Sequence, residues 1–495
     1  MSGGKPIFYS ALMLTGVNLL LRFVGTSFQV YISATLGPAG VGLLQLVLSV
    51  GSLAMVAGIG GIRTATMYLT AEELGRKKPG NVQRVLSGCF LYSIFCSGAI
   101  AAALYLFAPQ IADLWIRDSR TVDGLRLFAA FLPVTCLCGV MTGYFTAANR
   151  IGTLAAVEIA EQFCSMLVTL FSLRFWAGTD PGRACMSVIF GSAVGACLTL
   201  LCLVSLRMRA KSGTGPRIPV RRRLMGAAVP LALADVLKAG ISTTENLMVP
   251  RRLSLNLSIA DPLAAFGTLS GMVFPILMFP ACILFSLAEL LIPELARCAA
   301  AGSNGRIRYL VRRSLKVAML YGILFGGLLF LLAKPLCLRI YGSEEAGNWL
   351  RLYALMVPML YCDAITDAMT KGLGQQTACV RYNILTSAMD VVFLYLLLPK
   401  YGMDGYYASF LVTHLLNFGL SLRRLLKISG VQLPFHLPAL TLSAGILSAG
   451  IASLSGIFPW LAYVLLLFPM LVLMGILRKE DAVWIRKLVF RNCKS

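Results

Sequence analysis

The chain has 495 residues, of which 58% are hydrophobic and 13% are charged, and its formal net charge is +23. An ordinary soluble domain carries about 25% charged residues, so this composition excludes a soluble globular protein. No polar segment is long enough to fold as a separate aqueous enzyme domain, so any function must reside in apolar helices and short loops.

About fourteen apolar stretches follow one another along the chain, each long enough to cross the roughly 30 Å hydrocarbon core of a bilayer as a helix. We predict spans over residues 8–33, 42–69, 85–108, 125–147, 153–176, 184–206, 225–249, 264–292, 314–336, 349–370, 377–398, 405–426, 435–456 and 459–477. The connections, such as 36–40, 179–182 and 401–405, are rich in Gly and Pro, which is typical of turns. The sequence therefore predicts an all-α polytopic membrane protein.

The basic residues lie mainly in alternate loops between the predicted spans. Lys and Arg gather after spans two, six, eight and twelve and at the end of the chain, in segments 76–84, 207–223, 297–313, 423–427 and 478–494. The alternate loops are poor in basic residues, as expected when cytoplasmic loops retain Lys and Arg. We therefore attribute the charge to topology, not to nucleic-acid binding, and expect a multi-pass inner or plasma membrane protein with both termini in the cytoplasm.

Basic residues near the two ends of the sequence lie in segments of different character. Lys5 precedes an apolar stretch that contains Arg22 and exceeds the usual 7–15-residue core of a cleavable signal, so we expect a membrane span there. In the tail, residues 481–494 place apolar side chains at four-residue spacings between basic ones. That pattern predicts a short helix lying on the inner leaflet, with a frayed basic tail as the alternative.

The fourteen cysteines do not suggest a metal centre. Most fall inside predicted spans, where a thiol behaves as a small apolar residue. Cys136 and Cys138 form only a C-x-C pair, and the two histidines, His414 and His436, have no ligand-spaced companions. A zinc site needs several converging ligands, so we expect neither a metal nor a cofactor.

Structure-breaking residues recur when the chain is shifted by 225 positions. Gly42 then falls on Gly267, each at the start of the second span of its half, and Pro133 falls on Pro358. Such coincidences at matching span numbers indicate two six-span halves. Because six is even, both halves enter the membrane in the same orientation, as parallel repeats about an axis along the membrane normal.

The repeat predicts a domain organisation. We expect an N-terminal six-helix lobe over 1–222 and a C-terminal six-helix lobe over 223–430, related by a pseudo-two-fold axis. Residues 431–495 then supply two extra helices and a basic cytoplasmic tail. Repeats of this kind are characteristic of alternating-access transporters, in which the substrate site lies where the repeats meet.

Polar side chains interrupt the apolar spans, and a charge at mid-membrane costs about 2.5–3.5 kcal/mol even on the mildest scale. One face of the first span carries such residues at helical spacing, and so does one face of the seventh span. Arginines also lie near the ends of the second and seventh spans. The residues expected to bind substrate are Asn18, Arg22, Gln29, Arg63, Asp235, Lys238, Ser242, Glu245, Arg251 and Arg252.

Structural roles for these residues stay open as alternatives. Asp235 and Lys238 can neutralise one another, and Arg22 can cap helix carbonyls. Glu245 lies shortly before Arg251 and Arg252, so we expect its carboxylate to hold these arginines in an outward-closed lock, or merely to offset their charge. An incoming anionic substrate would compete for the arginines and favour opening.

Five further acids fall inside predicted spans. They either bind a coupling cation or proton or join helices by hydrogen bonds. These residues are Glu158, Glu161, Asp363, Asp367 and Asp390. Pro275 and Pro280 are expected to break the eighth span, and such bent helices are compatible with a gate.

Several short motifs resemble a known family. Residues 21–25 (LRFVG) and 58–73 resemble the opening helices of the multidrug/oligosaccharidyl-lipid/polysaccharide (MOP) exporter superfamily. Residues 247–253 (LMVPRRL), 266–275 and 291–295 resemble the stage V sporulation protein B group of polysaccharide-biosynthesis flippases. The likeness covers nearly the whole chain, and it implies two six-helix lobes around a central cavity.

The resemblance implies an alternating-access flippase, not an enzyme. Its substrate would be an undecaprenyl-pyrophosphate-linked saccharide, either a peptidoglycan precursor or another polysaccharide unit, moved from the inner to the outer leaflet. In related lipid II flippases, arginines on the first helix are required; Arg22 matches one, whereas the chain has Gln29 and no second base there. The expected partners are membrane lipids and this anionic substrate, with the protein as a monomer.

Two other classes remain as alternatives. A cation-coupled multidrug exporter of the same superfamily often has an acid on its first helix, and residues 8–33 contain none. An integral-membrane glycosyltransferase usually has acids in its first outer loop, and residues 34–41 contain none.

Overall fold

The computed structural model describes residues 4–59, 61–75, 79–148, 150–177, 180–208, 220–432, 436–454 and 458–477. The helix predicted over 481–494 lies outside these residues, as do the basic segments 76–78 and 209–219. Asn18 lies within a described helix, but its side chain is outside the described part of the structure.

The described residues form helices and no strands, which confirms the all-α prediction. The α-helices are α1 (Gly4–Ile59), α2 (Ile62–Gly75), α3 (Pro79–Gln110), α4 (Val122–Ala147), α5 (Ile151–Ser172), α6 (Pro181–Met208), α7 (Val220–Leu253), α8 (Pro262–Gly267), α9 (Phe274–Met278), α10 (Ala281–Ala300), α11 (Asn304–Tyr341), α12 (Glu344–Ala354), α13 (Val357–Gly372), α14 (Gln376–Ser429), α15 (His436–Leu454) and α16 (Pro459–Leu473). Short π-helices η1 (Ile111–Ile116), η3 (Leu173–Ala177) and η4 (Thr268–Val273) and the 3₁₀ turn η2 (Ser119–Thr121) complete them.

Two of these helices are each two spans joined at a glycine. At a rise of about 1.5 Å per residue, the 56 residues of α1 and the 54 residues of α14 would far exceed a bilayer if straight. Both contain one non-helical residue, Gly37 with φ 71° and Gly402 with φ 56°. A positive φ is a conformation that glycine adopts without steric cost, so the turns predicted at 36–40 and 401–405 are present.

By length and composition, seven helices of the described residues could cross a membrane, or up to nine if each bent helix pair counts as one span. Two of the seven are the merged helices α1 and α14. The predicted total of fourteen spans stays a prediction.

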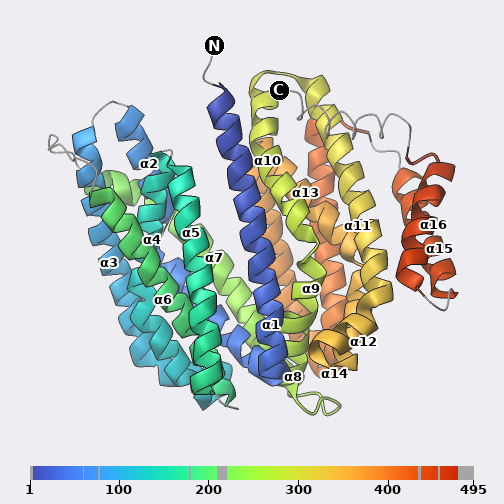
Figure 1. Ribbon diagram of the computed structural model, residues 1–495, viewed down its shortest axis with the longest axis horizontal. Helices are drawn as coiled ribbons and strands as arrows, with labels where there is room; N and C mark the ends of the chain where they lie inside the picture. Colours follow the sequence, from blue (N-terminus) through green and yellow to red (C-terminus); the bar gives the residue numbers. More distant parts are fainter. Residues whose placement is uncertain are drawn as a thin grey trace. The chain divides into compact units, whose positions relative to one another are not determined.

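The chain divides into two compact units (Figure 1). Unit 1 comprises Met1–Met272 and Ser387–Tyr406, and unit 2 comprises Val273–Thr386 and Tyr407–Ser495. In unit 1, α7 and α8 pack against α1. The lobe boundaries predicted from the repeat, at 222 and 430, stay predictions.

The core of unit 1 lies among α2 to α6. Fully buried Ile62, Cys89, Val140, Phe145 and Leu203 pack together there, each at 0% exposure. All come from predicted spans, so apolar residues identify the spans, while the packing selects which side of each span is buried.

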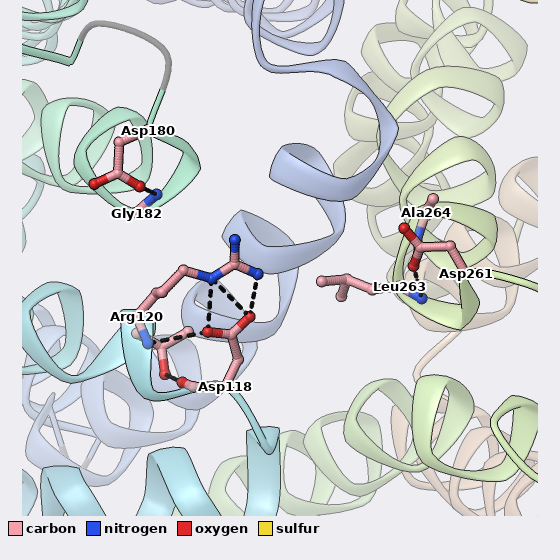
Figure 2. Close-up of polar contacts among 8 residues, drawn as sticks. Asp118, Arg120, Asp180, Gly182, Asp261, Leu263 and Ala264 are labelled. Carbon is pink, nitrogen blue, oxygen red and sulfur yellow. Dashed lines mark hydrogen bonds and ion pairs between the residues drawn. The ribbon is translucent and has the colours of Figure 1, made fainter.

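The base-poor loops of unit 1 meet at one end (Figure 2). The Asp118 carboxylate accepts hydrogen bonds from the backbone N–H and Nε of Arg120, at 3.0 and 2.9 Å. Arg120 also lies within electrostatic range of Asp180 and Asp261. Burial alone would raise the pKa of Asp118, but the hydrogen bonds and charge of Arg120 outweigh it and hold this pKa below its ordinary value.

Two more loops join this end of unit 1. The Asn256 amide donates to the carbonyl of Pro399 at 3.3 Å, and a Cβ on Gly40 would lie 3.7 Å from Pro181. The connections after predicted spans one, three, five, seven and eleven therefore gather together, as a succession of transmembrane hairpins requires.

Unit 2 contains the broken eighth span and the two extra helices. The chain bends at Phe279–Pro280, between α9 and α10, as the prolines predict. Hydroxyls of Tyr361 and Tyr321 donate to the carbonyls of Leu277 and Pro280, at 2.9 and 2.7 Å. These bonds satisfy carbonyls at the break, which bare lipid could not.

The helices α15 and α16 dock on α11 (Figure 1). Tyr463 of α16 is fully buried, and its hydroxyl donates to the carbonyl of Ile323 at 2.7 Å. A Cβ on Gly327 would overlap the Tyr463 ring, so a glycine permits this close approach. The two extra helices are thus packed against unit 2 by a specific contact.

Candidate functional site

A polar pocket of about 370 Å³ opens between α1, α5 and α6 in unit 1. Gln29 from the predicted polar face of α1 lines it, together with Glu161, Gln162, Ser165 and Ser192. Gly25, one turn before Gln29 on the same face, also lines it, and a Cβ at this glycine would lie 3.7 Å from the Gln162 amide nitrogen. The α5 residue Gln162 therefore lies beside the polar face of α1.

Charged groups surround this pocket. The Thr199 hydroxyl donates to the Glu161 carboxylate at 2.7 Å. Glu158, one turn earlier on α5, lies within electrostatic range of both Arg63 and Glu161. Arg22 is exposed and stands about one turn before Gly25 on α1. The structure therefore brings Gln29 of predicted span one together with Glu161 of span five, and Arg63 of span two near Glu158.

The polar face of α7 is exposed. Asp235, Lys238 and Ser242 all lie on the surface of unit 1, so both the substrate-binding prediction and mutual neutralisation of Asp235 and Lys238 stay predictions. On its buried side, Thr243 donates to the Ser49 carbonyl at 3.0 Å and Asn246 to the Ser49 hydroxyl at 2.9 Å. These bonds hold α7 against the second half of α1 and leave the predicted stripe accessible.

Glu245 pairs with an acid, not with arginines. Its side chain is hydrogen-bonded to Asp390 of α14, and Tyr406 lies within electrostatic range of both. Asp390 is only 6% exposed. The expected lock between Glu245 and Arg251 or Arg252 is therefore not formed. Two carboxyl groups can share a hydrogen bond only if one of them carries a proton, so this pair is a site where a proton can be held.

Arg251 and Arg252 instead line a larger cavity of about 1100 Å³. The guanidinium carbon of Arg252 lies 3.2 Å from the centre of the Tyr395 ring, a cation–π contact. The cavity extends along α7 from Val236 to Arg252, the end of the helix that leads into the base-poor loops.

The acids predicted in the tenth span lie in unit 2 and have local partners. Asn417 donates to the Asp363 carboxylate at 3.3 Å, and Lys371 pairs with Asp367 at 2.5 Å one turn away on α13. These contacts fit the interhelical alternative for Asp363 and an intrahelical ion pair for Asp367. Among the described residues, no group of three or more His, Cys, Asp or Glu side chains is placed to hold a metal ion.

Helices α1 and α8 cross in very close contact beside the base-poor loops. A Cβ on Gly267 would overlap the Pro38 carbonyl oxygen and lie 2.6 Å from the Gly42 backbone nitrogen. A Cβ on Gly42 would in turn overlap the Leu263 carbonyl oxygen. Gly42 and Gly267 are the pair that the 225-residue repeat equates, so the two copies of this position meet each other, as expected near a pseudo-two-fold axis.

Several residues of these candidate sites were not predicted from the sequence. Gln162 and Ser165 resemble ordinary polar positions on an amphipathic helix, and Trp115 and Arg117 fall at the end of a span, where aromatic and basic residues are common. Tyr406 follows a turn glycine and has no polar spacing partner. Only the packing of distant segments places Gln162, Ser165, Trp115 and Arg117 in the two pockets and Tyr406 beside Glu245 and Asp390.

Comparison with known proteins gives consistent likenesses. The family model MatE matches residues 14–173. The curated protein "Stage V sporulation protein B" of Bacillus subtilis (strain 168) is 20% identical over 406 residues, which cover 80% of this chain and 78% of that protein.

Solved structures share the fold. "Lipid II flippase MurJ, inward closed conformation" aligns with a TM-score of 0.69 at 14% identity, covering 97% of this chain and all of that one. The "inward-facing conformation of a multidrug resistance MATE family transporter of the MOP superfamily" aligns with a TM-score of 0.65 at 13% identity, covering 86% of this chain and all of that one. Both likenesses show the two-lobed all-α fold.

Proposed function

We propose that the chain is a flippase of the MOP exporter superfamily for a polyprenyl-pyrophosphate-linked saccharide. The family model, the sporulation relative and both solved structures point to this superfamily. It is a multi-span membrane transporter; its substrate, its coupling and the orientation of its termini are parts of the proposal. The substrate would be a peptidoglycan precursor or another polysaccharide unit, moved from the inner to the outer leaflet by alternating access.

The observation that carries the proposal is the polar side of unit 1. Arg22 and Arg63 supply positive charge, and guanidinium groups bind phosphate oxygens with two parallel hydrogen bonds. Beside them, Gln29, Gln162 and Ser192 offer amide and hydroxyl groups suited to sugar hydroxyls. An anionic head that carries sugars matches this combination better than an apolar solute does.

The contact between α1 and α8 supports alternating access. At the end where the base-poor loops gather, the Ser33 hydroxyl donates to the Gly271 carbonyl at 2.5 Å, and a Cβ on Gly271 would overlap Val41. With the termini in the cytoplasm, this end is the outer one, so the described conformation is closed toward the outside. Substrate would then enter from the inner leaflet, and separation of α1 from α8 would release it outward.

A cation-coupled multidrug exporter is the second candidate. Glu161 lines the polar pocket, and a carboxylate there suits an organic cation. The likeness to a multidrug transporter of the same fold agrees with it. Because the solved neighbours bear the names of transporters, we propose no catalytic role, and a glycosyltransferase has no supporting observation.

Reconstitution separates the two candidates. Purified full-length protein is placed in liposomes with fluorescent lipid II, and separately with a fluorescent organic cation under a proton gradient. We expect protein-dependent movement of lipid II between leaflets and no uptake of the cation. Cation uptake without lipid II movement would overturn the flippase and favour the exporter.

Arg22→Ala is expected to lower lipid II movement at least tenfold without loss of folded protein. The side chain is exposed, so truncation removes the charge that pairs with pyrophosphate and opens no core void. Arg22→Lys should restore transport only in part because lysine lacks the planar fork. The rates are measured in the same liposomes, with Arg183→Ala as the control at an exposed arginine outside the pocket. Normal transport by Arg22→Ala would show that this part of α1 does not contribute to the substrate site.

A further inference from the structure

The larger cavity in unit 1 has the lining of a lipid site. Its volume is about 1100 Å³, and its walls come from α7, from Leu53 of α1, from the 388–395 stretch of α14 and from the end of η1. Most lining side chains are apolar, such as Leu237, Ile241, Leu247 and Val391, and none is an acid. An apolar cavity of this size suits a long hydrocarbon chain and not a hydrated solute.

Three arginines line this apolar space. Arg117 follows η1, and Arg251 and Arg252 end α7. Within the described part of the chain none of the three forms an ion pair, and the Arg252 guanidinium lies over the ring face of Tyr395. Three guanidinium groups on a cavity whose lining contains no acid favour an anion, and phosphate is a group that guanidinium binds with two parallel hydrogen bonds.

Arg117 is held in an unusual backbone conformation. It has φ 61° and is the one non-glycine residue with positive φ among the described residues. Such a conformation costs about 1–3 kcal/mol and persists where the surrounding structure imposes it, often at ligand sites. The preceding π-helix η1 is another irregularity common at functional sites. Together they carry Trp115 and Arg117 to the cavity formed with α7 and α14.

We propose that this cavity binds a polyprenyl diphosphate, with the diphosphate on Arg117, Arg251 and Arg252 and the prenyl chain along the apolar walls. This inference rests on the proposed function, because it assigns the lipid part of the same substrate class to a second site. The cavity adjoins the base-poor loops, so under the proposed topology it holds the lipid carrier in the outer leaflet. It lies apart from the polar pocket of α1, α5 and α6, with which it shares no lining residue.

Binding to the full-length protein in detergent tests the site with three probes. Undecaprenyl diphosphate has both head and chain, undecaprenol has the chain alone, and inorganic pyrophosphate has the head charge alone. We expect undecaprenyl diphosphate to bind at least tenfold more tightly than either of the others, by native mass spectrometry or fluorescence competition. Equal competition by phosphatidylglycerol would overturn the assignment in favour of an ordinary anionic-lipid site.

Variants address head and chain separately. Arg117→Ala with Arg251→Ala should weaken undecaprenyl diphosphate binding at least tenfold and leave undecaprenol unaffected. Gly240→Leu should weaken both lipids, because Gly240 lines the cavity and an added Cβ there has no atom within 4 Å, so the side chain fills the space without a backbone clash. Gly98→Leu on α3, also free of neighbours within 4 Å, is the matched control outside the cavity. Unchanged binding by Gly240→Leu would refute the cavity.

The inference and the proposed function fail in different ways. Arg22→Ala is expected to stop lipid II movement and to leave undecaprenyl diphosphate bound in this cavity. If the wild type moves no lipid II but binds undecaprenyl diphosphate, and Gly240→Leu weakens that binding, the proposed function is wrong and the proposed lipid site is supported. If the wild type moves lipid II and Gly240→Leu leaves the binding unchanged, only the proposed lipid site is wrong.

Discussion

Gly267→Ala is expected to lower transport at least tenfold, although it adds a single methyl group. The new Cβ would overlap the Pro38 carbonyl oxygen. That oxygen is a backbone atom and the position of a Cβ is fixed by its own backbone, so neither atom can rotate away as the end of a long side chain can. The helices α1 and α8 would have to separate, so the conformation closed at this end would be lost. Overpacking usually costs about 1–3 kcal/mol, which is enough to shift a two-state equilibrium by one or two orders of magnitude.

Thiol labelling distinguishes this effect from misfolding. Val41 is 1% exposed and contacts Gly271 in the closed contact, so Val41→Cys, in a background without other cysteines, should be protected from a membrane-impermeant maleimide. Adding Gly267→Ala should expose it. Gly16→Ala, on α1 with no neighbour within 4 Å, is the control and should leave both transport and protection unchanged. Continued protection with normal transport would show that the contact does not govern access.

Glu245→Gln is expected to remove the dependence of transport on a proton gradient. Glutamine keeps the size of the side chain and can still hydrogen-bond Asp390, but it cannot lose or gain a proton. In the described conformation the carboxyl groups of Glu245 and Asp390 are hydrogen-bonded, which requires a proton on one of them. Release of that proton in another conformation would couple transport to pH. The neutral side chain of Glu245→Gln should therefore make the rate of transport insensitive to the proton gradient.

The measurement is lipid II movement in liposomes with and without an imposed pH difference. Asp390→Asn should behave like Glu245→Gln, and the double variant should be no worse than either alone, because the pair acts as a unit. Asp367→Asn is the control, since Asp367 pairs with Lys371 on its own helix. If both single variants keep the full response to the gradient, the pair is structural and joins α7 to α14.

The candidate sites combine contacts that the sequence predicts with contacts that it does not. Helical spacing placed Gln29 and Gly25 on one face of α1, and both line the polar pocket. The same reasoning expected Glu245 to hold Arg251 and Arg252, because these residues are close in sequence. In the structure, Asp390, 145 positions later in the numbering, takes the hydrogen bond of Glu245.

The sequence by itself determined the class of fold, because hydrocarbon leaves a chain no option but to satisfy its backbone within helices. It also located the turns at Gly37 and Gly402 and the break at Pro280, since glycine and proline act through local backbone geometry. The tertiary structure alone decided which carboxyl groups share a proton, which arginines line a common cavity and which glycines meet. Those outcomes depend on contacts between segments far apart in the chain, and helical periodicity gives the face of a helix but not the neighbour that covers it.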